Sequence, residues 1–300
     1  MTTKKIHLVF LSISLIFSSK IFAQDDMLSG LENKNEKQYI TNAFKSSRVI
    51  NGHSMEFIGK GVLDVRILHR FGFLNSGFRN LFGLDEASMR FGFDYGVTKD
   101  LTLGIGRSTF DKEWDGFVKY RPLQQSIGGK HPSPVSLVWV SGMAVATKTW
   151  LTPQRDNFSF YNELIIGRKF NEHFSAQIAP THVHLNIVGG QQYTNDIFAV
   201  GFGARYKISK RTAFVVDYHY IIKPMNEEDD EAPTNPQFEN MKNPLAIGFD
   251  IETGGHVFQL HFTNSYGMNE KAFITKTSST WGKGEISFGF NLSRVFTVNK

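Results

Sequence analysis

Four histidines have the residue type and spacing that could build a metal or haem site. His182 and His184 lie two residues apart, so on an extended strand they would share one face. We expect this face to be the inner one, and we expect His219, close to Asp217, and His261 to face inward as well. Neutral imidazoles at one level could bind zinc, copper or haem iron. The alternative is a polar interior whose histidines bond to neighbours and to water.

Charged residues at alternating positions form a second group of candidate site residues, which would line the interior of a barrel. They are Arg66, Arg70, Arg90, Asp94, Lys119, Arg121, Glu163, Asp217 and Asp250. The early members are mostly basic and the later ones acidic, so opposed charges across a pore would select polar solutes. The alternative is a set of ion pairs that fills a small barrel, because only barrels of about 16–18 strands reliably leave an open channel.

Enzymatic chemistry has little support in the sequence. It contains no Gly-x-Ser-x-Gly elbow, no His-Glu-x-x-His pair and no phosphate-binding loop of the Walker type. Cysteine is absent, which excludes a thiol nucleophile, a cysteine-rich zinc site and an iron–sulfur centre. We therefore expect a protein that is not an enzyme and has no resident cofactor.

Two-residue alternation of apolar and polar residues predicts the elements that position these side chains. Residues 89–97 and 286–292 are clear examples, with large apolar residues on one face. We expect about twelve strands, as in a transmembrane barrel with its apolar face outward. They lie near 55–71, 88–98, 101–108, 115–122, 134–148, 157–169, 174–187, 196–208, 212–222, 244–252, 256–265 and 285–298. The predicted fold class is all-β, a transmembrane antiparallel up-and-down barrel; a soluble sandwich would instead cover its apolar face with a second sheet.

The connections between these strands alternate in length. Tight turns are expected at 98–100, 171–173, 209–211 and 253–255, all after even-numbered strands, and longer links follow the odd-numbered ones. Outer-membrane barrels have this arrangement, with short turns in the periplasm and longer loops outside. The link 123–133 is an exception, because it follows an even strand and is long. The apolar link 74–87 is expected to fold inward or to form a short helix.

The N-terminus has the features of a cleaved signal peptide over residues 1–23: two lysines, an apolar stretch and a small residue, Ala23, before the cut. Residues 24–52 would form a periplasmic leader and residues 53–300 the barrel. No later apolar run approaches the roughly 18–20 residues of a membrane helix, so a membrane-embedded chain must be a closed barrel. Losing the lysines of the signal brings 33 basic residues closer to 28 acidic ones, so no nucleic-acid partner is expected.

Several short segments resemble a known family. These are residues 44–54, 69–72, 81–85, 104–108 and 115–120. Together they resemble a bacterial β-barrel family designated as domain of unknown function 5777. The resemblance implies an outer-membrane location in a Gram-negative bacterium and implies no chemistry.

The predicted function is porin-like passive passage or binding of a small polar solute through a polar lumen. One alternative is a closed barrel that binds metal or haem at the four histidines, and a less favoured one is a lipase-like outer-membrane enzyme. The expected partners are outer-membrane lipids, lipopolysaccharide and the barrel-assembly machinery. The acidic run 227–231 is read as a solvated loop, with a divalent-cation site near lipopolysaccharide as the alternative.

Overall fold

The computed structural model describes residues 36–147, 157–189, 193–224 and 235–298. The expected signal peptide and the acidic run 227–231 lie outside these ranges. None of the described helices is both long enough and apolar enough to cross a membrane.

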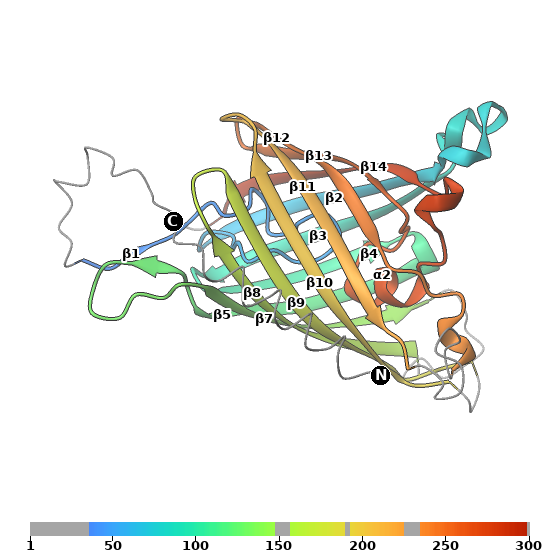
Figure 1. Ribbon diagram of the computed structural model, residues 1–300, viewed down its shortest axis with the longest axis horizontal. Coiled ribbons are helices and arrows are strands. Elements are labelled where there is room, and N and C mark those ends of the chain that lie inside the picture. Colours follow the sequence, from blue (N-terminus) through green and yellow to red (C-terminus); the bar gives the residue numbers. More distant parts are fainter. Residues whose placement is uncertain (1–35, 148–156, 190–192, 225–234, 299–300) are drawn as a thin grey trace, which may run out of the picture. The chain divides into compact units, whose positions relative to one another are not determined.

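Twelve antiparallel strands close into a barrel, as Figure 1 shows. They are β2 (Val62–Phe73), β3 (Ala87–Thr98), β4 (Leu101–Ser108), β5 (Glu113–Leu123), β7 (Ser136–Ala146), β8 (Phe158–Lys169), β9 (Phe174–Leu185), β10 (Asp196–Lys207), β11 (Thr212–Ile222), β12 (Leu245–Thr253), β13 (His256–Thr263) and β14 (Ser287–Thr297). Pairing of β14 with β2 closes the barrel. The predicted fold class is confirmed, and most strand ends differ by only a few residues from those expected.

Side chains alternate between the two faces of the wall, as the pleat of a strand requires. Large apolar residues such as Phe202 on β10 and Leu103 on β4 are exposed on the outer face, where a barrel contacts lipid. On the inner face, large side chains lie across glycines of neighbouring strands. A Cβ on Gly106 would lie 2.2 Å from Arg90 Nη2, and one on Gly142 would lie 2.3 Å from a ring carbon of Tyr161. These glycines provide the space that the bulky inner residues occupy.

The connections divide the barrel into two ends. The turn end carries the tight turns at 99–100, 170–173, 208–211 and 254–255, and the loop end carries the other links, which except for 109–112 are longer. The link 124–135 is long although it lies at the turn end, because it contains β6 (Ser126–Ile127), which pairs with the N-terminal strand β1 (Gln38–Tyr39). The exception in the sequence pattern therefore marks a second, two-stranded sheet.

Short helices occur in the connections. They are η2 (Leu74–Ser76), η3 (Phe78–Gly83), η4 (Phe110–Lys112), η6 (Pro236–Phe238), α2 (Glu270–Lys276) and η7 (Trp281–Lys283). The link 74–86 forms the short helical turns that were one of its two expected outcomes. It does not fold inward, because Phe78 is 79% exposed, and Figure 1 shows this link projecting beyond the barrel wall.

Two segments fill the interior of the barrel. Residues 43–58, here called the lumenal hairpin, precede β2 and turn back on themselves through an Arg48–His53 bridge. Val49 N–H donates to Gly52 O (2.9 Å) at the tip of the hairpin. Residues 264–286, here called the inner loop, enter from the loop end and include α2. The predicted first strand began at 55, whereas β2 begins at Val62, because residues 55–58 belong to the hairpin.

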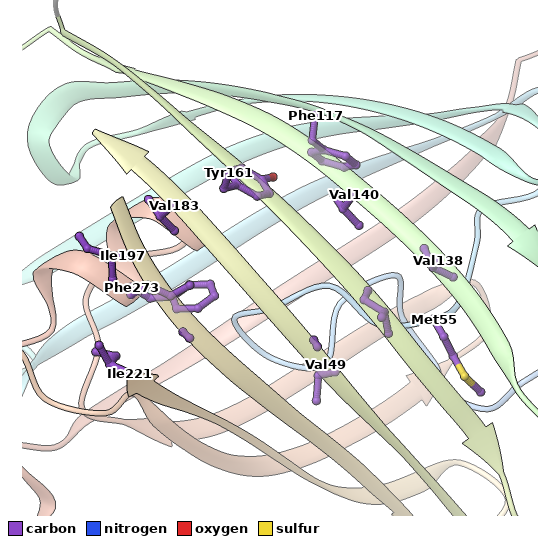
Figure 2. Close-up of a cluster of buried hydrophobic side chains, with 14 of the residues drawn as sticks. Val49, Met55, Phe117, Val138, Val140, Tyr161, Val183, Ile197, Ile221 and Phe273 are labelled. Carbon is purple, nitrogen blue, oxygen red and sulfur yellow. The ribbon is translucent and has the colours of Figure 1, made fainter. Parts of the chain in front are cut away.

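An apolar cluster lies between these segments and the wall. Figure 2 shows Val49 and Met55 of the hairpin and Phe273 of α2 among the side chains of the wall strands. Val183 and Tyr161 belong to the same cluster and are almost completely buried. The interior therefore contains a hydrophobic core as well as polar groups.

Candidate functional site

The tip of the lumenal hairpin is bound by one carboxylate of the wall. Asp217 Oδ2 on β11 accepts hydrogen bonds from the backbone N–H groups of Ile50 (3.2 Å), Asn51 (2.6 Å) and Gly52 (3.0 Å). The other oxygen, Oδ1, lies 3.0 Å from His219 Nε2. Hydrogen bonds to an ionised acceptor are roughly twice as strong as neutral ones, so Asp217 is a major anchor of the hairpin.

Side-chain amides of β13 and β14 bind the carbonyl groups at the tip. Gln259 Nε2 donates to Val49 O (2.6 Å), and Asn291 Nδ2 donates to Ile50 O (2.9 Å). Asn291 Nδ2 also donates to Gln259 Oε1 at 3.0 Å, which orients both amides. The wall therefore satisfies acceptors as well as donors of the hairpin backbone, as buried polar groups require.

The arms of the hairpin are held in the same way on the opposite side of the wall. Gln177 on β9 accepts from Met55 N–H (2.9 Å) and donates to His53 O (2.6 Å). Lys119 Nζ on β5 donates to Ser47 O (3.2 Å) and to Glu56 O (2.6 Å). These contacts reach backbone groups, so they fix the path of the chain largely independently of its side chains.

An ion pair joins the hairpin to the inner loop. Arg48 Nη1 lies 3.0 Å from Glu270 Oε1 of α2, and both side chains are fully buried. His53 Nε2 lies 3.6 Å from the same Glu270 oxygen. Burial and the Arg48 guanidinium hold the pKa of His53 well below its usual value, so its imidazole is neutral at neutral pH. The two segments that fill the lumen therefore meet at a buried polar contact.

The inner loop has its own anchors at the loop end. Glu113 on β5 accepts from Asn269 Nδ2 (2.6 Å) and forms an ion pair with Lys271, and all three side chains are buried. Phe273 packs against His219, with 4.6 Å between ring centroids. Because His219 is also bonded to Asp217, one pair of wall residues contacts both the hairpin and the inner loop.

The structure places most of the predicted charged residues in this interior. Arg66, Arg70, Arg90, Asp94, Lys119, Glu163, Asp217 and Asp250 are almost completely buried. Arg121 lies at the turn end and donates to Asp100 Oδ1 through Nε (2.9 Å). Several of these residues form local pairs on the predominantly basic side, such as Arg90 with Asp115 (2.5 Å). The interior therefore does not separate into a purely basic and a purely acidic wall.

Two buried acidic side chains lack hydrogen bonds within the part of the chain that the structure describes. Neither oxygen of Asp94 on β3 or of Glu163 on β8 has a hydrogen-bond partner among the described residues. Arg48 and Arg66 also have unpartnered buried nitrogens. Unsatisfied buried groups of both signs indicate that this part of the lumen suits small polar occupants, including water.

The predicted four-histidine cluster does not form. His219 and His261 are buried on the inner face, but the side chains of His182 and His184 are 36% and 40% exposed and belong to the outer face. Both outer imidazoles lie within 2.8 Å of Asp196 Oδ1. The inward assignment is wrong because Val183, between them, packs into the internal apolar cluster.

The cross-strand partners show the same orientation. His182 pairs with Phe198, whose ring it stacks on, and His184 pairs with Phe160; both phenylalanines are exposed on the outer face. Residues paired across strands share a face. Among the residues that the structure describes, no group of three metal-ligating side chains has a suitable arrangement.

The lumenal hairpin was not predicted from the sequence. The expected leader, 24–52, is described from residue 36 onward, and its last ten residues are buried or half-buried within the barrel. The segment Phe44–Ser54 carried one signal, since it contributed the longest of the motifs on which the family resemblance depends. A cavity of about 370 Å³ remains beside the hairpin at the turn end, lined in part by Lys45, Asp64 and Glu252.

Comparisons with known proteins agree with this architecture. The family model described as "Membrane bound beta barrel domain (DUF5777)" matches residues 44–296, a range that includes the hairpin. No curated protein matches the chain.

Solved outer-membrane proteins are similar to the chain in fold. The NanC porin aligns with a TM-score of 0.51 at 11% identity, covering 77% of this chain and 98% of that one. The COG4313 outer membrane channel from Pseudomonas putida F1 aligns with a TM-score of 0.46 at 10% identity, covering 81% and 98%. At such low identity the similarity concerns the barrel fold alone.

Proposed function

The chain belongs to the membrane-bound β-barrel family DUF5777 and is located in the outer membrane, and from this we propose that it is a gated channel for a small polar solute. The lumenal hairpin is the proposed gate, and its docked position is the closed state. The lumenal hairpin and the inner loop occupy the interior, and passage requires the hairpin to leave its position.

The observation that carries this proposal is how the hairpin is held. It lies outside the barrel ladder, so the twelve-stranded wall keeps all its backbone pairing when the hairpin moves. Wall side chains hold it through hydrogen bonds to its backbone, each worth about 1 kcal/mol net on average. A barrel that is permanently closed could fill its lumen with large side chains of the wall strands and would not need a separate segment.

The groups around the hairpin support a polar solute. Displacing the hairpin exposes Asp217 and Gln259 on one side and Lys119 and Gln177 on the other, all of which now bind its backbone. Donors and acceptors that bind peptide groups can bind a solute that carries amide, hydroxyl or ionised groups. Lumenal residues of both charges select polar over apolar solutes in the same way.

A reversible lock tests the gate directly. The chain has no cysteine, so an engineered pair is the only possible disulfide. A Cβ on Gly203 would lie 2.8 Å from Val49 Cγ2, so the side chains of cysteines at these two positions would be in direct contact. We expect the Val49→Cys/Gly203→Cys protein to show no conductance in planar bilayers when oxidised. Reduction should restore the openings seen with each single-cysteine control.

Two outcomes would contradict the proposal at different points. Equal conductance of the oxidised and reduced double variant would show that the hairpin is not the gate. Absence of conductance from the reduced protein, the single variants and a protein lacking residues 43–58 would show that the barrel is not a channel. Folding of each variant is checked by the faster gel migration of the unheated barrel.

A further inference from the structure

The link 74–86 at the loop end presents large apolar side chains to the outside. Phe78 is 79% exposed, and Leu81, Phe82 and Leu84 are each about half exposed. The rings of Phe78 and Phe82 contact each other edge to face at 6.3 Å. A solvated surface loop has no need of four such residues within seven positions.

Hydrogen bonds within the link, and one to the inner loop, fix its conformation. Phe82 N–H donates to Gly77 O (2.9 Å), and Asn75 Nδ2 donates to Lys283 O (3.1 Å). Leu81 and Phe82 both adopt left-handed backbone conformations, with φ values of 45° and 53°. Bulky residues rarely adopt this conformation, and where they do the strain often serves a binding surface. The fold therefore holds these side chains outward.

The link begins next to the lipid-facing surface of the barrel. On the outer face of β2 and β14, the ring of Phe71 stacks on Phe288 at 5.8 Å, and His69 stacks on Phe290 at 5.0 Å. Phe73, the last residue of β2, is half-buried at the start of the link, and its ring packs against Tyr266 with 4.8 Å between centroids. Figure 1 shows the link leaving the end of β2 on the outer side of the wall.

We propose that the link 74–86 is a membrane anchor that inserts Phe78, Leu81 and Phe82 into the outer leaflet around the barrel. Its occupant is lipid, because the link leaves the wall beside the outer-face rings of Phe71 and Phe288, which lipid already covers. Arg79 lies between the apolar residues, where its guanidinium can reach lipid phosphate. Aromatic and basic residues are enriched at this depth of a membrane.

Fluorescence of single-cysteine variants tests this anchor. An environment-sensitive fluorophore is placed at Phe78→Cys, with Phe202→Cys on the lipid-facing wall and Lys130→Cys on the exposed turn-end link as the two controls. The proteins are reconstituted into phosphatidylethanolamine–phosphatidylglycerol vesicles that contain acyl-chain nitroxide lipids. We expect the label at position 78 to be quenched about as strongly as the one at 202, and severalfold more than the one at 130.

The opposite result overturns the proposal. A label at position 78 that is quenched by aqueous iodide and not by nitroxide lipid would place the link in water. Efficient disulfide dimerisation of Phe78→Cys, with lipid quenching absent, would instead assign the surface to a second copy of the chain. The Phe78→Ser/Phe82→Ser variant tests whether the apolar side chains themselves, rather than the backbone conformation of the link, bind lipid. It should fold and migrate as the native barrel but lose binding of the link to lipid, measured with a label at Asn80→Cys.

Discussion

At the scale of single residues, the interior is organised around side chains that bind backbone. Asp217 accepts three N–H groups of the hairpin tip, and Lys119 and Gln177 bind its arms. Two properties of these residues can be read from the sequence. They are charged or polar, and they occupy the alternate strand positions that face the lumen. What they bind could not be read from the strands, because the hairpin lies outside the alternating pattern.

Removing the charge of Asp217 is expected to loosen the hairpin tip. Asp217→Asn keeps the size of the side chain but replaces a charged acceptor of three hydrogen bonds by a neutral one. We expect a loss of about 2–3 kcal/mol in docking of the hairpin. Amide hydrogen exchange of Ile50, Asn51 and Gly52 measures it. Asp94→Asn is the control, since Asp94 is equally buried and, among the described residues, neither of its oxygens has a hydrogen-bond partner; equal effects in both variants would contradict the anchoring role.

His53 is expected to make docking of the hairpin weaker in acid. Burial and the Arg48 guanidinium lower the pKa of the docked imidazole, whereas an undocked hairpin has an ordinary histidine pKa near 6.5. The undocked state therefore binds a proton that the docked state does not, and docking weakens as the pH falls through about 6.5. Burial raises the pKa of Glu56, which acts in the opposite direction at lower pH.

The His53→Gln variant isolates this effect. Its hairpin exchange should change less between about pH 7 and pH 5.5 than that of the native chain. An identical pH response in both proteins would assign the acid sensitivity to other groups of the lumen.

The histidine assignments show the limit of alternation at this scale. Alternation assigned Asp217 and His219 correctly because the opposite phase of β11 carries the large side chains Phe214, Val216, Tyr218 and Tyr220, which are typical of a lipid face. On β9, His182 and His184 alternate with Val183 and Leu185, which fit either an apolar core or a lipid face. Their orientation is determined by the pairing of Phe198 and Phe160 with them, and cross-strand register is a long-range property.

At the scale of elements, connections carry the features that distinguish this barrel. The long turn-end link was visible in the sequence as an exception, and its pairing with β1 explains it. The lumenal position of the hairpin and of α2 could not be predicted in this way. Both are short, irregular segments whose burial depends on contacts with residues far away in the chain, such as that between Arg48 and Glu270.

Glu113 is expected to hold the inner loop inside the barrel. Glu113→Gln would leave the buried ammonium group of Lys271 without its ion pair, and breaking a buried pair in this way typically costs about 3–5 kcal/mol. We expect faster trypsin cleavage after Lys271 in proteoliposomes. Asp111→Asn serves as the control, because its partner Lys276 is at the surface, where a pair contributes at most about 1 kcal/mol. Similar cleavage in both variants would argue against this anchor.

At the scale of the whole molecule, the sequence predicted the architecture nearly completely. Period-two alternation persists in strand after strand, and closure follows because lipid cannot satisfy a free sheet edge. The contents of the lumen were less predictable. The interior combines ion pairs, amide contacts and an apolar cluster that includes Tyr161 and Val183, so its polarity was only partly visible in the strand pattern.

The lipid-facing surface is expected to respond to charge according to depth. Phe202 lies near the middle of β10 and Tyr206 near its turn end, and both are exposed on the outer face. Phe202→Arg should destabilise the folded barrel by about 2–4 kcal/mol and Tyr206→Arg by about 0–1 kcal/mol. Unfolding by urea in lipid vesicles measures both. Equal costs would show that the two positions do not differ in membrane depth.

The path of the chain near the pairing of β14 with β2, which closes the barrel, has a consequence for how the protein assembles. β1 pairs with the link 124–135 and β2 begins beside the C-terminal end of β14, so both arms of the hairpin leave through the turn end. The lumenal hairpin therefore enters and leaves the lumen at the same end of the barrel, and it does not pass through the barrel from one end to the other. It can therefore dock after the barrel has closed, and it can be withdrawn through the turn end without separating β2 from β14.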